Sequence, residues 1–153
     1  MYFEVTSIFK LDLLIDDELT YRVIGCAMKV HSTLGNGFQE VIYQRCPAIE
    51  LEKAKILFAR EVEQAIFYSG IDVGTRRADF IVEDKLIVEL KAVIDLEDVH
   101  LAQTKNYLTA YNFDLGLLIN FVATSLQHKR VFRAKKHNES RPSLNPANPD
   151  ADN

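Results

Sequence analysis

The chain of 153 residues has no tryptophan, only four prolines and only two cysteines. Cys26 and Cys46 lack the spacing of a metal site, and no Cys/His cluster suits structural zinc. Both cysteines fall in predicted helices. We therefore interpret them as small core residues of a protein in a reducing compartment.

Long apolar runs are also missing from the sequence. None approaches the roughly 20 residues that a membrane-spanning helix needs. The first ten residues lack the basic start and apolar stretch of a signal peptide. We find no internal repeat, and 48% hydrophobic residues suffice for one domain with a proper core. These observations predict a cytoplasmic protein with a single domain over residues 1–137.

The chain has no excess of positive charge, since 18 basic residues face 22 acidic ones. This balance argues against a protein that coats nucleic acid by charge alone. It does not exclude a nuclease, because a carboxylate site is itself acidic and a bound metal reverses the local field. Basic residues gather at Arg76 and Arg77 and again over residues 127–137.

Hydrophobic periodicity predicts an α/β fold with a mixed sheet. The predicted elements are helices over 16–34 and 38–54, a strand over 60–68, a hairpin over 75–93, a helix over 97–111, and strands over 115–121 and 126–133. Pro47 is expected to kink or break the second helix. Residues 1–15 receive no assignment, and the polar tail over 138–153 is expected to be disordered.

The predicted hairpin carries the most informative residues of the chain. Asp79 lies in its first apolar run, and Glu89 and Lys91 lie in the second. Side chains alternate along a strand, so Glu89 and Lys91 point the same way. A buried charge costs several kcal/mol unless it is paired or binds a metal. We therefore predict a functional site here, although an ion-pair network at a sheet edge is the alternative.

These residue types suit the hydrolysis of a phosphodiester, which needs a metal, an activated water and a stabilised leaving group. Mg²⁺ or Mn²⁺ prefers hard oxygen ligands, which Asp79, Glu89 and the backbone carbonyl of Leu90 supply. Lys91 is expected to orient or deprotonate the attacking water.

A carboxylate followed by carboxylate-x-Lys resembles the pattern of the PD-(D/E)xK phosphodiesterase superfamily, here Asp79 with Glu89-Leu90-Lys91. Residues 37–43, Gly-Phe-Gln-Glu-Val-Ile-Tyr, resemble the motif of the GxxExxY family, and the agreement extends over about 18–133. That family is grouped with these nucleases, near the RecB-like branch. The resemblance implies a restriction-endonuclease-like core, α-β-β-β-α-β, with helices flanking a mixed central sheet.

The resemblance also implies further site residues. Glu40 matches an acidic residue that joins the metal site, although a charge favouring the helix dipole is the alternative. Gln103 and Tyr107 match a Gln-x-x-x-Tyr pair on one helix face, which we expect to position water or nucleic acid. We expect Tyr43 to orient its neighbours. Nucleic-acid contacts are predicted for Tyr107 and for the basic residues Arg76, Arg77, Lys129 and Arg130, whose alternative is a solvated surface.

The leading hypothesis is a Mg²⁺- or Mn²⁺-dependent nuclease, with DNA favoured over RNA. The alternative is a catalytically inert module of the same fold that binds nucleic acid or a partner protein; Pro47 and the acidic pI favour it. A hydrolase of small phosphate esters is a third option, without a supporting motif. A homodimer is compatible with either of the first two hypotheses.

Overall fold

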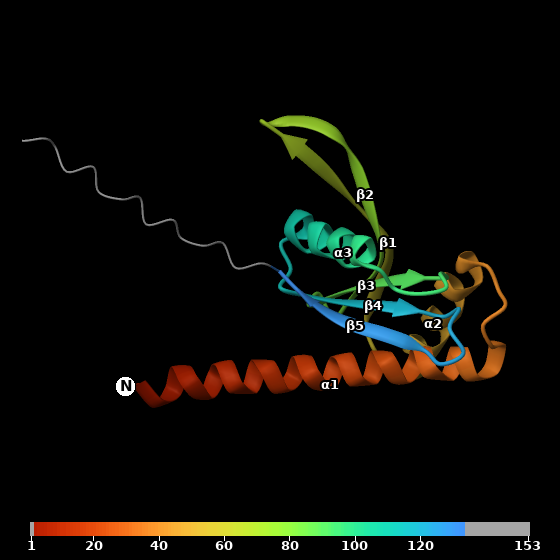
Figure 1. Cartoon of the computed structure of the whole chain (residues 1–153). Coiled ribbons are helices and arrows are strands. Elements are labelled where there is room, and N and C mark those ends of the chain that lie inside the picture. Colours follow the sequence, from red (N-terminus) through yellow and green to blue (C-terminus); the bar gives the residue numbers. More distant parts are fainter. Residues whose placement is uncertain (1, 134–153) are drawn as a thin grey trace, which may run out of the picture.

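The computed structural model describes the backbone of residues 2–133 and the side chains of residues 17–133. It contains helices α1 (Tyr2–Leu34), α2 (Glu40–Lys53) and α3 (Asp98–Tyr111), and strands β1 (Phe58–Tyr68), β2 (Ile71–Val82), β3 (Leu86–Lys91), β4 (Leu115–Asn120) and β5 (Gln127–Phe132) (Figure 1). The predicted order of elements is confirmed, whereas α1 begins far upstream of the expected position. The predicted tail over 138–153 lies outside the described residues.

The five strands form one sheet in the order β1-β2-β3-β4-β5. Neighbours are antiparallel except β3 and β4, which are parallel and are joined through α3. Helices α1 and α2 cover one face of the sheet and α3 covers the other (Figure 1). The predicted α/β fold with a mixed sheet is therefore confirmed. Within the described residues, no helix combines the length and the apolar character needed to cross a membrane.

The central strands lie in the core because nearly every side chain on them is apolar. All six residues of β4 are buried, as are the first five of β3. On α1, the inward stripe is spaced as a helix face requires and consists of Leu19, Val23, Cys26, Ala27 and Val30. Coverage of both sheet faces explains why β3 and β4 read as nearly continuous apolar runs rather than as alternating patterns.

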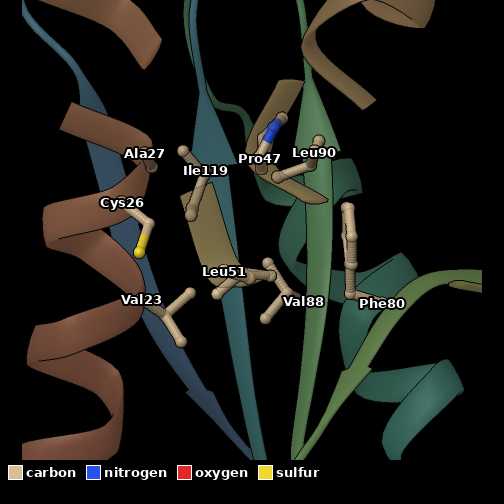
Figure 2. A pocket seen from close by; sticks show the side chains of 9 residues that line it. All are labelled: Val23, Cys26, Ala27, Pro47, Leu51, Phe80, Val88, Leu90 and Ile119. Carbon is tan, nitrogen blue, oxygen red and sulfur yellow. The ribbon is translucent and has the colours of Figure 1, made fainter. Parts of the chain in front are cut away.

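Pro47 does not break α2, so the expected break was wrong, whereas the expected kink stays a prediction. The helix continues through it to Lys53, and Pro47 is buried. Its ring lines a cavity of about 10 Å³ between α1, α2 and the sheet, together with Cys26 and Leu90 (Figure 2). Burial of the ring offsets part of the cost of the missing N–H. A cavity this small and apolar is a packing defect rather than a ligand site.

Strands β1 and β2 continue beyond the sheet as a two-stranded ribbon that bends over α3 (Figure 1). Only Phe80–Val82 of β2 pair with β3, whereas β2 pairs with β1 from Ile71 onward. We call residues 63–77 the arm. All seven β2 residues of the arm are exposed, from Ile71 to Arg77. The arm is thus held by its own cross-strand pairs and by its base.

Candidate active site

The candidate site begins where β2 and β3 separate. Their pairing ends at Phe80 and Val88. Just beyond, the backbone N–H of Leu90 donates to Asp79 Oδ2 at 2.8 Å, and the N–H of Asp79 lies 3.3 Å from Glu89 Oε1. Each carboxylate thus accepts a backbone donor that the diverging strands leave unpaired. We call Asp79, Glu89 and Leu90 the fork.

Helix α2 brings Glu40 towards the fork from one face of the sheet. Glu40 is the first residue of α2, and Gln44 lies one turn further on. The side-chain amide Nε2 of Gln44 donates to Glu40 Oε1 at 3.2 Å and to Asp79 Oδ1 at 3.1 Å. The guanidinium of Arg60 donates a hydrogen bond to the backbone carbonyl of Gln44 at 3.1 Å. A single amide therefore connects two acidic residues that are far apart in sequence.

The carboxylates of the fork are electrostatically unfavourable as anions. Burial raises the pKa of Glu89 to about 8, and the neighbouring charge of Asp79 acts in the same direction. Burial also raises the pKa of Asp79, against the hydrogen bond from Leu90, and the charge of Glu40 adds to the rise. Glu89 is only 4% exposed. Among the ion pairs of residues 17–133, none within 4.0 Å involves Asp79 or Glu89, so a bound cation would relieve the repulsion between their charges.

Lys91 follows Glu89 on the same face of β3, as predicted, and is half-buried. Its charge opposes the rise in pKa of both Asp79 and Glu89, so it lies within electrostatic range of the fork. Among the described residues, no ion pair within 4.0 Å involves Lys91. Its ammonium is therefore not committed to a structural salt bridge.

Helix α3 brings Gln103 and Tyr107 to the other face of the sheet. Both side chains are half-buried. Burial raises the pKa of Tyr107, and the charges of Glu89 and Asp79 add to the rise, which places its phenol near the fork. The guanidinium of Arg76 lies 5.6 Å from the centre of the Tyr107 ring. The structure thus brings together Tyr107 and Arg76, two predicted nucleic-acid contacts.

Tyr43 and Tyr111 hold the segments around the site. Tyr43 is fully buried, stacks on Phe121 with ring centres 4.6 Å apart, and donates to the carbonyl of Gly35 at 2.5 Å. This fixes the loop before α2, and the orienting role of Tyr43 in the site stays a prediction. The hydroxyl of Tyr111 accepts from the N–H of Ala78 at 3.0 Å and contacts the carbonyls of Val62 and Arg76.

Sequence reasoning missed Gln44 and Tyr111. The partners of Gln44 lie on two elements, and its only local signal was the i, i+4 spacing from Glu40. Tyr111 is likewise four residues after Tyr107 on α3, and its partners lie on β1 and β2. Such contacts become visible only once the elements are assembled.

Two predicted contact residues are not brought into this cluster, and a third lies at its edge. Arg77 is exposed on the arm and is paired in register with Glu63, but its charge opposes the rise in pKa of Asp79, so it lies within electrostatic range of the fork. Lys129 is exposed on β5, two strands away from β3. Arg130 forms an ion pair with Asp17 of α1, on the face of the sheet opposite α3. Their predicted role in binding nucleic acid stays a prediction.

The donor set of the site suits a hard divalent cation. Asp79, Glu89 and Glu40 offer carboxylate oxygens, and the carbonyl of Leu90 points to the same side of β3 as the N–H that meets Asp79. Over residues 17–133, however, no three acidic, His or Cys side chains already stand in the arrangement of a metal site. Instead, the amide of Gln44 and two backbone N–H groups donate hydrogen bonds to the carboxylate oxygens.

Two solved structures resemble part of the chain. SSO0001 shares 18% identity at a TM-score of 0.45, over 57% of this chain and 46% of that one. An alkaline exonuclease (LHK-Exo) from Laribacter hongkongensis shares 9% identity at a TM-score of 0.43, over 57% of this chain and 52% of that one. The resemblance thus spans about half of each of those proteins. No curated protein matches the chain.

The model of one protein family matches most of the chain. Residues 17–131 match the PD-(D/E)XK nuclease superfamily, a stretch that includes α2, the fork and α3. The order of elements and the mixed sheet flanked by helices agree with the restriction-endonuclease-like core predicted from the sequence. The chain therefore belongs to the PD-(D/E)XK nuclease superfamily.

Proposed function

We propose that this protein is a metal-dependent nuclease that hydrolyses phosphodiester bonds of DNA. The observation that carries the proposal is the convergence of Asp79, Glu89 and Glu40 at the separation of two strands, with Lys91 on the face of Glu89. Folding alone gives no reason to bury acidic side chains beside one another. In a member of a nuclease superfamily, such a cluster is best explained by the chemistry it performs.

In this proposal, Asp79, Glu89, Glu40 and the carbonyl of Leu90 hold Mg²⁺ or Mn²⁺. The bound ion would supply positive charge for the phosphate and would lower the pKa of a water molecule. Lys91 orients or deprotonates the attacking water, and its charge supports the developing negative charge. From the other face of the sheet, Gln103 and Tyr107 position water or the nucleic acid.

A cleavage assay tests the proposal on labelled single- and double-stranded DNA and RNA, with Mg²⁺ and with Mn²⁺. We expect metal-dependent cutting of DNA. Replacing Lys91 with Ala should slow it by about 10²–10⁴-fold, the usual contribution of a positioned acid or base. Lys85→Ala is the matched control, because Lys85 is exposed in the turn at the opposite end of β3. Equal rates for the two lysine variants would contradict the role of Lys91.

A second candidate is an inert module of the same fold that binds nucleic acid or a partner protein. The absence of a preformed group of metal ligands over residues 17–133 favours it. Titration with Mn²⁺ separates the two candidates. A nuclease should take up the ion and lose that uptake in Asp79→Ala, whereas an inert module should show no specific uptake in either protein.

We also propose that the chain falls in the GxxExxY group, near the RecB-like branch. Glu40 and Tyr43 of that motif support this, because one reaches the fork through Gln44 and the other fixes the preceding loop. A cytoplasmic location and a homodimer remain parts of the proposal. Chromatography with light scattering of the full chain would report the homodimer directly.

A further inference from the structure

A hollow of about 480 Å³ lies between the arm and α3. Gln64, Phe67 and Arg76 line it from the arm, and Asn106 and Thr109 line it from α3. The rest of its lining is apolar and consists of two alanines and an isoleucine. Its volume falls within the roughly 300–1,000 Å³ that is usual for sites of small ligands. The hollow is distinct from the packing defect behind the sheet, which is far smaller and entirely apolar.

The hollow adjoins the candidate active site through Arg76. This residue lines the hollow, and its guanidinium also lies 5.6 Å from the centre of the Tyr107 ring. Tyr107 in turn lies close enough to Glu89 and Asp79 for both charges to raise the pKa of its phenol. The hydroxyl of Tyr111 contacts the carbonyl of Arg76 at 3.0 Å, which fixes this end of the arm against α3. A chain lying in the hollow would therefore lead to the fork.

The side chains of the hollow match the parts of an unpaired nucleotide. Phe67 is 62% exposed and offers a ring on which a base can stack. Arg76 offers a cation for a phosphate, and the amides of Gln64 and Asn106 offer donors and acceptors for a base edge. In a duplex the base faces are stacked inside, so the ring of Phe67 would have no base to meet.

On the basis of the nuclease function proposed above, we infer that this hollow binds an unpaired nucleotide of a single-stranded nucleic acid. The neighbouring phosphate of the same strand then lies at the fork. The preferred substrate is thus a single strand or the unpaired end of a duplex. Phe67 and Arg76 determine this preference, and they do so without taking part in the chemical step.

Binding in the presence of EDTA tests the inference separately from cleavage. Fluorescence anisotropy would compare a labelled 12-nucleotide oligothymidine, the matching oligouridine and a 12-base-pair duplex on the full-length protein in low salt. We expect one or both single strands to bind at least about tenfold more tightly than the duplex. Phe67→Ala should weaken single-strand binding by about fivefold or more, as the loss of one stacked base predicts.

Phe132→Ala is the matched control, because Phe132 is 60% exposed but lies on β5 at the other edge of the sheet. It should bind single strands as the unmodified protein does. Arg76→Ala should reduce the slope of log affinity against log salt by about 0.7, the value for one lost phosphate contact on a single strand. Circular dichroism would verify that each variant is folded.

Several outcomes would overturn the inference: equal or tighter binding of the duplex, no binding of any probe, or equal effects of Phe67→Ala and Phe132→Ala. A protein partner that competes for the arm while oligonucleotides do not bind would also overturn it. The nuclease proposal is judged independently by metal-dependent cleavage and its loss in Lys91→Ala. A protein that cuts duplexes but ignores single strands would retain the nuclease function and lose this inference.

Discussion

The two ends of β2 lie in opposite environments. From Phe80 to Val82 the strand is buried between β1 and β3, whereas from Ile71 to Arg77 every residue is exposed and only β1 pairs with it. Asp79 lies at the change from one environment to the other. The comparison shows that the acidic cluster lies where the core ends. The buried part of the sheet holds these residues rigidly, and the exposed arm begins directly beside them.

The largest expected effect is a difference in the free energy of unfolding between substitutions at the two ends of the β1–β2 pair. Phe80 is 1% exposed and Phe67 is 62% exposed. Replacing Phe80 with Ala should lower the free energy of unfolding by about 3–5 kcal/mol, because it leaves a cavity in the core. The same change at Phe67 should cost no more than about 0.5 kcal/mol. Urea denaturation measures both, and similar losses would show that the arm is part of the cooperative core.

The next effect concerns pH and the fork. The folded protein favours the neutral form of Glu89, whose pKa rises from 4.5 to about 8. Stability of the metal-free protein should therefore be greatest below about pH 4.5 as far as Glu89 is concerned, and should fall towards pH 8 by a few kcal/mol. Glu89→Gln should remove most of this fall, whereas Glu63→Gln on the arm should not. Thermal unfolding in EDTA at several pH values provides the measurement.

A smaller effect is expected at the connection between α2 and β2. Gln44→Met should lower the free energy of unfolding of the metal-free protein by about 1–2 kcal/mol, because Glu40 and Asp79 lose an amide that donates to both. Gln39→Met is the control, since Gln39 is exposed and its side chain makes no capping hydrogen bond. An equal loss of unfolding free energy in the control would contradict the role of Gln44 in connecting Glu40 and Asp79.

The smallest effect should come from the base of the arm. Tyr111→Phe removes the hydroxyl shared by Ala78, Val62 and Arg76, and should cost about 1 kcal/mol. Amide hydrogen exchange should also become faster at the N–H of Ala78. Tyr68→Phe serves as the comparison, because Tyr68 is 75% exposed at the end of β1. Unchanged exchange in Tyr111→Phe would mean that the arm is held by its strand pairs alone.

Much of the fold could be predicted from the sequence because the relevant signals are local. The alternation of side chains along a strand predicts that Glu89 and Lys91 share one face of β3. The apolar runs predict that β3 and β4 are buried. The predicted break of α2 at Pro47 was wrong because helix propensity describes an isolated helix, whereas here the ring is buried against the sheet.

The part of the site that escaped prediction depends on contacts between distant segments. Gln44 could be placed on the helix face of Glu40, but nothing local shows that Asp79 lies on its other side. The first strand of the arm was predicted as part of an ordinary strand over 60–68, because its residues alternate as a sheet strand does, and residues 71–74 received no assignment. The pairing of β3 with β2 stops at Val88 and leaves the arm to project, which is a property of the assembled sheet.

The self-contained pairing of the arm has a consequence for how this protein can diversify. Residues from Ala65 to Thr75 have no ladder partner except one another. Lengthening each strand of the arm by two residues would extend its reach while every side chain below keeps its face. Adding a single residue to one strand would reverse the faces of the residues beyond it. Length changes among descendants of this chain should therefore accumulate in matched pairs at the arm, while the chemistry stays in place.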